Sequence, residues 1–243
     1  MKNKVKQITS WSFSRYSDYK QCPLKAKLKH LDKIAEPKSA AMERGSDIHS
    51  KAEGYIKGNL RTLPSELKTF ADKFKMLRQA YNKRLQGMAV EDMWAFTSDW
   101  GQTTWDNWIN CWIRIKLDCA YYVDHEMKIL KICDWKTGKF RAEMNEEYIE
   151  QLELYALAAL LIYPHVEKVV PELVYLDAGV VYPSSDEAFT FTQKDLPKLK
   201  KLWVKRTKAM LNDKIFAPRP NDKCRWCYYR ASNKVNGGGQ CKF

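Results

Sequence analysis

Two acidic residues and one lysine have a spacing that could support hydrolysis of a phosphodiester bond. The segments Trp112–Val123 and Lys128–Lys136 are predicted to pair as a β-hairpin. Because strand side chains alternate, Asp134 and Lys136 point the same way, about 7 Å apart along the strand. If Asp118 lies across from them, two carboxylates meet, which is unfavourable unless Mg²⁺ or Mn²⁺ binds between them. The lysine would then orient the attacking water and stabilise the scissile phosphate. Charged residues on a strand are also often simply solvated.

Four of the seven cysteines are placed as ligands of a metal or cluster would be. Cys224 and Cys227 form a C-x-x-C pair, Cys241 follows a glycine-rich stretch, and Cys22 lies beside Pro23. This spacing lets two thiolates hold one zinc ion or one iron–sulfur cluster. A redox pair or four unrelated thiols are alternative interpretations. The other three cysteines lie in apolar, strand-like segments and are interpreted as core residues: Cys111, Cys119 and Cys133.

The elements that must position these residues follow from periodicity and composition. A helix over Glu146–Tyr163 is apolar nearly all round past Leu152, so it should be buried against a sheet. Other helices are predicted over Ser12–Ile34, Arg44–Gly58, Leu63–Gln86 and Thr192–Asn212. Strands are predicted over Val90–Ser98, Trp108–Val123, Lys128–Trp135 and Glu172–Val181. We expect one α/β domain with a helical part over 1–87, a catalytic core over 88–191, and a last helix and Cys-rich tail over 192–243.

Composition indicates a globular protein that meets an acidic partner. Of the 243 residues, 45% are hydrophobic and 29% are charged, which excludes wholesale disorder. The net charge of +13 favours nucleic acid as that partner, although a basic protein without such a partner has the same composition. The longest apolar run, Leu154–Tyr163, is too short to cross a membrane, and Met1–Ser10 does not resemble a signal peptide. We therefore expect a cytoplasmic protein with reduced cysteines.

Short motifs lie in one order along nearly the whole chain. They are Ser12–Leu24 with Gln21-Cys22-Pro23, Gly45–His49, Ile113–Asp118, Asp134-Trp135-Lys136-Thr137-Gly138-Lys139, Gln151–Tyr155, and one early and three late cysteines. This series resembles the RecB-like exonucleases of the PD-(D/E)XK superfamily, and its cysteines resemble those of the AddB-like and CRISPR-associated iron–sulfur members. The resemblance implies a restriction-endonuclease-like mixed sheet flanked by helices. The family's usual glycine before the first acid is missing, and Asp124, expected in a turn, is the nearby rival of Asp118.

The resemblance also implies a role for each matched residue. Asp118, Asp134, the carbonyl of Trp135 and His49 would hold Mg²⁺ or Mn²⁺, with Glu53 as a weaker candidate. Lys136 would orient the attacking water. Two residues at helical spacing, Gln151 and Tyr155, would position the DNA backbone or brace the lysine, although both also fit packing roles. Four thiolates would hold a structural cluster, 4Fe-4S or alternatively Zn²⁺: those of Cys22, Cys224, Cys227 and Cys241.

The function expected from the resemblance is a metal-dependent DNA exonuclease that acts on single strands or free ends in recombination, replication or repair. No G-x-x-x-x-G-K-[ST] motif is present, so a helicase, recombinase or single-strand-binding protein would be a separate partner. A structure-specific endonuclease and a non-catalytic nucleic-acid-binding protein with a Cys₄ site are the alternatives. Tryptophans between Trp94 and Trp112 would stack bases or pack in the core. The basic runs Lys25–Lys29 and Lys198–Lys208 would follow phosphates or face solvent.

Overall fold

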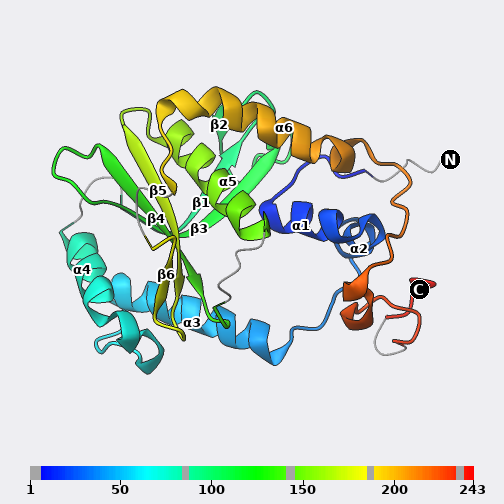
Figure 1. The fold of residues 1–243 in the computed structure, drawn as a ribbon, viewed down its shortest axis with the longest axis horizontal. Helices are drawn as coiled ribbons and strands as arrows, with labels where there is room; N and C mark the ends of the chain where they lie inside the picture. Colours follow the sequence, from blue (N-terminus) through cyan, green and yellow to red (C-terminus); the bar gives the residue numbers. More distant parts are fainter. Residues whose placement is uncertain (1–6, 84–87, 141–145, 185–188, 234–237) are drawn as a thin grey trace.

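A mixed β-sheet forms the centre of the computed structural model, which describes residues 7–83, 88–140, 146–184, 189–233 and 238–243 (Figure 1). Within these residues the sheet has six strands in the order β2-β1-β3-β4-β5-β6. Neighbouring strands are antiparallel except for β4 and β5, which are parallel and are connected through helix α5. The strands are β1 Ala89–Phe96, β2 Gln102–Thr103, β3 Ile113–Tyr122, β4 Ile129–Lys136, β5 Lys168–Tyr175 and β6 Val180–Tyr182.

Helices cover both faces of this sheet (Figure 1). One face packs against α1 (Phe13–Gln21), α5 (Glu146–Ile162) and α6 (Leu196–Asn212), and the other against α3 (Ala40–Ile56) and α4 (Ala71–Asn82). Each face has its own hydrophobic cluster, so the sheet lies between two cores. The predicted mixed α/β fold with flanking helices is thereby confirmed. The short helical segments are α2 Pro23–Ala26, η1 Lys27–Leu31, η2 Ser65–Phe70, η4 Gln193–Asp195 and η5 Asp222–Trp226.

Helix α5 is the buried helix that its composition predicts. Nearly every residue from Leu152 to Leu160 is buried, because the sheet covers one side of the helix and α1 and α6 lie over the other. Its polar residues Gln151 and Tyr155 are therefore held on a helix that has little freedom to move. Among the residues that the structure describes, no helix combines the length and the apolar content needed to cross a membrane.

Three predicted elements are wrong in their bounds. The helix predicted over Ser12–Ile34 breaks at Cys22, which is extended (φ −161°, ψ 118°) because Pro23 disfavours a helical residue before it. The strand predicted over Glu172–Val181 is two strands, β5 and β6, joined by a turn that ends at Gly179 (φ 67°). The strand predicted from Trp108 begins only at Ile113. Burial confirms the three core cysteines, Cys111, Cys119 and Cys133.

An ion cluster around Asp18 fixes the chain just after Cys22. The buried carboxylate of Asp18 lies 2.9 Å from the Lys25 ammonium, 3.1 Å from that of Lys29 and 2.9 Å from Nε2 of His30. Burial alone would raise the pKa of Asp18, but the hydrogen bond to His30 and the charges of the lysines outweigh it and hold the pKa well below its usual range. Lys25 and Lys29 are thus paired inside the protein, and the prediction that this run follows phosphates is wrong for them.

Replacing Asp18 with asparagine is expected to lower the free energy of unfolding at pH 7 by about 2 kcal/mol, because three charged or polar partners lose the negative charge that they pair with. The folded-state pKa is depressed, so this stabilisation is present above the unfolded pKa of about 4 and is lost as the pH falls below it. Urea unfolding at pH 7 and at lower pH tests both statements. Asp72→Asn, whose side chain is fully exposed, is the matched control and should leave stability unchanged. Equal stability of Asp18→Asn and wild type at pH 7 would contradict the expectation.

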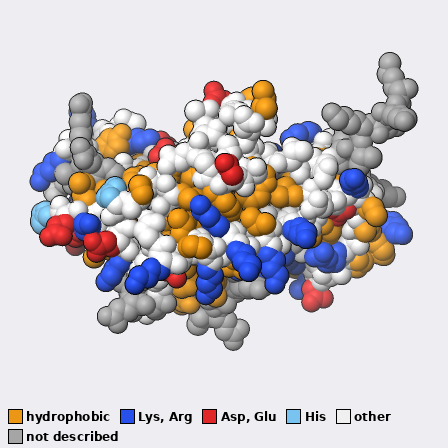
Figure 2. Space-filling model, turned by 90° about the horizontal axis from the view of Figure 1, so that it is seen from above, with side chains coloured by type: hydrophobic (Ala, Val, Ile, Leu, Met, Phe, Trp, Pro, Cys, Tyr) orange, Lys and Arg blue, Asp and Glu red, His pale blue; other side chains and the backbone are white. Residues whose placement is uncertain are grey.

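Exposed lysines on α6 face solvent on one side of the molecule. Lys198, Lys201, Lys205 and Lys208 are exposed, whereas Leu199, Trp203 and Met210 of the same helix are buried. Figure 2 views this side and shows Lys and Arg side chains across its central part. The helix therefore packs one apolar stripe against α5 and α1 and offers a basic stripe to solvent.

Candidate active site

Three carboxylates lie side by side across three neighbouring strands. The β1–β3 register pairs Val90 with Cys119 and Asp92 with Leu117, which puts Glu91 level with Asp118. The β3–β4 register pairs Cys119 with Cys133 and places Asp118 level with Asp134 by the same reasoning. Like charges directly opposite one another destabilise a sheet. A cation bound between the carboxylates would reduce this repulsion.

Glu91 is the member of this group that sequence reasoning missed. It has φ 51°, in the left-handed region that non-glycine residues rarely adopt, and its backbone makes no pair in the β1–β3 ladder. Its Oε2 lies 2.6 Å from the Lys116 ammonium. Its Oε1 is buried without a hydrogen-bond partner among the described residues, and Nδ1 of His49 is 3.6 Å away. Such a strained, incompletely satisfied carboxylate is typical of a functional site.

His49 reaches the carboxylates from α3. Its Nδ1 lies 3.1 Å from Oδ1 of Asp118, and its Nε2 lies 3.0 Å from the carbonyl oxygen of Trp135. One ligand atom from each of His49, Glu91 and Asp118 lies within 4.8 Å of the others. Burial alone would lower the pKa of His49, but the hydrogen bond to Asp118 and the nearby Glu91 carboxylate outweigh burial and raise the pKa to about 10. Without a metal, an imidazolium supplies the positive charge that the carboxylates need.

The backbone of α3 can come close to the site because of one glycine. A Cβ built on Gly45 would lie 3.3 Å from the side-chain oxygen of Thr137, just beyond the end of β4. Ser39 caps the helix by accepting a hydrogen bond from the backbone N–H of Met42. The motif Gly45–His49 therefore combines a close helix–strand approach with a histidine one turn later.

Lys136 and two residues of α5 surround Asp134. The Lys136 ammonium lies 2.6 Å from Oδ2 of Asp134 and donates to Oε1 of Gln151 at 3.0 Å. Tyr155 donates to Oδ1 of Asp134 at 2.9 Å, and Gln151 donates to the same oxygen at 3.2 Å. Burial alone would lower the pKa of Lys136, but the Asp134 carboxylate outweighs it and raises the pKa. The lysine is thus charged and held in place.

Asp118 is buried beside this pair and accepts a hydrogen bond from the backbone N–H of Trp135 at 2.7 Å. Burial, together with the charge of Asp134, raises the pKa of Asp118 above its usual range. Two neighbouring buried carboxylates beside a charged lysine form a site whose electrostatics would change strongly on binding of a cation.

The structure brings most of the predicted site residues into one cluster. They are His49, Asp118, Asp134, Trp135, Lys136, Gln151 and Tyr155. Asp124 lies apart from it, because its carboxylate accepts hydrogen bonds from the backbone N–H groups of Lys128 and Ile129 in the hairpin turn. Glu53 lines the cleft near His49, but its carboxylate pairs with Lys57 at 2.7 Å.

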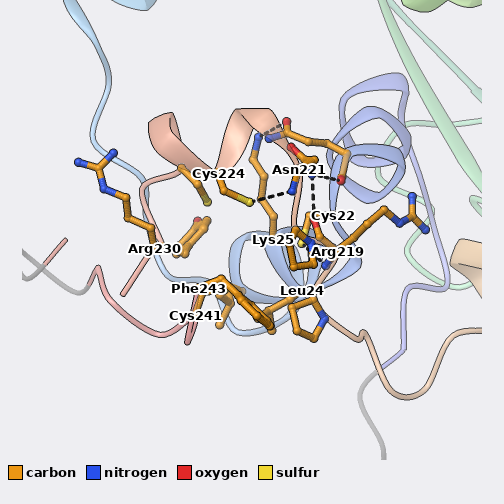
Figure 3. A pocket seen from close by; sticks show the side chains of 15 residues that line it. Cys22, Leu24, Lys25, Arg219, Asn221, Cys224, Arg230, Cys241 and Phe243 are labelled. Atoms are coloured by element: carbon orange, nitrogen blue, oxygen red, sulfur yellow. Dashed lines mark hydrogen bonds between the residues drawn. The ribbon is translucent and has the colours of Figure 1, made fainter. Parts of the chain in front are cut away.

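The four predicted cysteine ligands line one cavity near the α1–α2 junction (Figure 3). Cys22 comes from that junction, Cys224 and Cys227 from η5 and its end, and Cys241 from the last residues of the chain. Sγ of Cys22 accepts a hydrogen bond from the backbone N–H of Arg219, and Sγ of Cys224 accepts one from that of Asn221, both at 3.3 Å. Backbone donors that point at sulfur are typical of thiolates that bind a metal or cluster.

Comparison with known proteins gives a consistent picture. Residues 10–232 match the family model described as the PD-(D/E)XK nuclease superfamily. The crystal structure of a "putative exonuclease" from Eubacterium rectale is similar, with a TM-score of 0.51 and 14% identity over 90% of this chain and 88% of that one. The crystal structure of SSO0001 has a TM-score of 0.46 and 13% identity, over 96% of this chain and 90% of that one. No curated protein matches the sequence significantly.

Proposed function

Since the chain belongs to the PD-(D/E)XK nuclease superfamily, we propose that it is a metal-dependent deoxyribonuclease that digests DNA from free ends, with single strands as the preferred substrate. The observation that carries this proposal is the convergence of three carboxylates and a charged lysine on three neighbouring strands. A protein that only bound nucleic acid would have no need to bury these charges, which cost stability.

The donor set of the site fits a hard divalent cation. Carboxylates, an imidazole and a backbone carbonyl suit Mn²⁺ and, apart from the imidazole, Mg²⁺. The residues that would hold it are His49, Glu91, Asp118, Asp134 and the carbonyl of Trp135. The buried oxygen of Glu91 without a hydrogen bond supports the fit. When bound, the metal would lower the pKa of a coordinated water and neutralise charge on the phosphate.

The chain's own side chains would supply positioning and charge. Lys136 would donate to the attacking water or to the phosphate, where negative charge increases during cleavage. Gln151 accepts from this lysine and so fixes its direction. Tyr155 and Gln151 both donate to Oδ1 of Asp134, which leaves that carboxylate one orientation.

Replacing Glu91 with glutamine is expected to weaken Mn²⁺ binding about 100-fold, because one anionic ligand of the proposed site is lost. Isothermal titration calorimetry with MnCl₂, on protein whose active site has been stripped of metal, measures the affinity. Glu53→Gln is the matched control: Glu53 lines the same cleft but pairs with Lys57, so its substitution should change the affinity by less than about three-fold. Unchanged Mn²⁺ affinity in Glu91→Gln would remove Glu91 from the ligand set.

A digestion assay tests the proposed activity and separates it from endonuclease action at the same site. Linear single- and double-stranded DNA, labelled separately at each end, would be incubated with the protein in Mg²⁺ or Mn²⁺. Progressive loss from one end, with a circular single strand left intact, is the expected result. Cleavage of the circle would favour an endonuclease, and no cleavage of any substrate would contradict a nuclease function for this chain.

We also propose that Cys22, Cys224, Cys227 and Cys241 hold a structural iron–sulfur cluster of the 4Fe-4S type, with Zn²⁺ as the alternative. Four thiols from distant parts of the chain in one cavity, with backbone donors on two of the sulfurs, support this proposal. Such a group would connect the α1–α2 junction to the C-terminal segment. We further propose that the activity serves recombination, replication or repair, beside a separate helicase, recombinase or single-strand-binding protein.

A further inference from the structure

A second cleft adjoins the catalytic side chains on the side of α1. It has a volume of about 420 Å³ and is formed by the start of α1, the beginning of β3 and one side of α5. Gln151 and Tyr155 line it together with Lys116, and Lys116 also lines the cleft that contains His49 and Glu91. The two clefts therefore meet at Lys116. Other polar and aromatic residues that line this second cleft are Ser12, Ser14, Arg15, Trp105 and Arg114.

A backbone pairing brings the two arginines of this cleft together. The backbone N–H of Trp11 donates to the carbonyl of Trp112 at 2.8 Å, and that of Arg114 donates to the carbonyl of Trp11 at 2.9 Å. Both guanidiniums then share one hydroxyl: Arg15 donates to Oγ of Ser10 at 3.2 Å and Arg114 donates to it at 3.3 Å.

These two positive charges lack a negative partner. Among the described residues, neither guanidinium has a carboxylate within 4.0 Å, and Nη2 of Arg114 is buried without a hydrogen bond. Burial lowers the pKa of Arg15, and the charge of Arg114 lowers it further. Two desolvated like charges side by side cost stability, and an anion between them would recover it.

Helix α1 adds donors at the same place. Ser12 caps the helix, its Oγ lies 3.0 Å from Oγ of Ser14, and no acidic residue stands in the first turn. The positive end of the helix dipole and the first N–H groups of α1 thus lie on the side of the cleft where the two arginines are. No acidic side chain in the first turn neutralises them.

One tryptophan beside the arginines is open to solvent. The Arg114 guanidinium lies 4.7 Å from the ring centre of Trp108 and 5.8 Å from that of Trp105. Trp108 is 81% exposed and its neighbour Ile109 is 92% exposed, which is unusual for large apolar side chains. By contrast, Trp94 and Trp100 are buried in the core, so of the two roles that the sequence leaves open, core packing holds for these two.

We propose that this cleft binds one nucleotide of the substrate strand, with its phosphate between Arg15 and Arg114 at the start of α1 and its base on Trp108. The proposal rests on the proposed nuclease function and adds to it the part of the strand that lies beside the scissile bond. The phosphate is either an internal phosphodiester or a terminal phosphate, since both present the same oxygens to the two guanidiniums.

Strand binding tests the subsite independently of cleavage. Fluorescence anisotropy with a short single-stranded oligodeoxynucleotide, without added divalent metal, gives Kd at several salt concentrations. Arg15→Gln and Arg114→Gln should each weaken binding about ten-fold and reduce the slope of log Kd against log salt by about one. Trp108→Ala should weaken single-strand binding about ten-fold and duplex binding much less. Arg61→Gln, which removes the same charge from a loop outside both clefts, should change neither Kd nor slope.

Comparing the binding of a 5′-phosphorylated and a 5′-hydroxyl version of the oligonucleotide shows whether the bound phosphate is terminal or internal. An arginine effect confined to the phosphorylated strand identifies a terminal phosphate, and an equal effect on both identifies an internal one. Wild-type Kd and slope in both arginine variants would overturn the subsite. If circular dichroism shows that Arg114→Gln does not fold, the test of the subsite rests on Arg15→Gln alone. Arg15→Lys, which keeps the positive charge, is then its comparison variant. A wild-type protein that cleaves nothing, with variants that still lose binding, would refute the nuclease function but leave the subsite standing.

Discussion

Replacing Asp118 with asparagine is expected to lower the rate of DNA cleavage by about a thousand-fold. Asp118 lies between Glu91 and Asp134 in the sheet and also faces His49, so every proposed ligand is next to it. Losing its charge removes the centre of the cation site, and the charge stabilisation that a metal gives a phosphoryl transition state is about 4 kcal/mol. That energy corresponds to about three powers of ten in rate. Single-turnover digestion of an end-labelled single strand in Mn²⁺ measures it.

Asp124→Asn is the matched control for this variant. It makes the same chemical change on the same hairpin, but Asp124 only accepts backbone hydrogen bonds in the turn. It should cleave at the wild-type rate. Because the amide oxygen of an asparagine at position 118 can still accept a hydrogen bond from the backbone N–H of Trp135, the fold of Asp118→Asn should survive, and thermal unfolding verifies this. Asp118→Asn protein that unfolds like wild type and still cleaves at more than a tenth of its rate would refute the proposed site.

Replacing Cys224 with serine is expected to lower the melting temperature by about 6–12 °C and to release the proposed metal or cluster. The segment after α6 has little regular structure of its own among its described residues, and it docks on the α1–α2 region through a few contacts. Arg219 donates to the carbonyl of Lys20, and Tyr229 donates to that of Ile34. A metal or cluster that joins Cys22 to this segment closes a very long loop and so stabilises the fold. Losing about 3 kcal/mol shifts the melting temperature by that amount in a chain of this size.

Calorimetry and elemental analysis of anaerobically purified protein measure both effects. Iron with visible cluster absorbance in the wild type would identify the cluster, and stoichiometric zinc would identify the alternative. Cys111→Ser is the control, because Cys111 is a buried thiol that does not line the cysteine cavity, and its metal content should match wild type. Wild-type protein that carries neither metal, with Cys224→Ser equally stable, would contradict a structural metal site.

The sequence carried enough information for the central hairpin and for α5. Alternation predicted strands over Trp112–Val123 and Lys128–Lys136, close to the observed β3 and β4. The face shared by Asp134 and Lys136 follows from that alternation, whereas the place of Asp118 across from them is given by the observed register of the hairpin. Continuous apolar character past Leu152 required burial of α5, which brings Gln151 and Tyr155 to Asp134.

The features that could not be predicted depend on contacts between distant segments. Glu91 reaches the site only through the β1–β3 register and its left-handed backbone conformation, and the local sequence predicts neither of these. Arg15 and Arg114 become neighbours only because Trp11 pairs with β3. Two other errors in the predicted bounds have local causes: Pro23 interrupts the helix predicted over 12–34, and Gly179 lies at the turn that divides the strand predicted over 172–181.

The backbone of Glu91 implies a trade-off between stability and activity within β1. Glycine adopts a φ near +50° with less strain than any other residue. A buried carboxylate without a full set of hydrogen bonds further lowers the stability of the folded state. A chain selected for stability alone would therefore carry glycine at position 91. The acid at this position fits the proposed metal site instead, so the proposed function and stability favour different residues at position 91. Stabilising designs of this protein should leave position 91 unchanged.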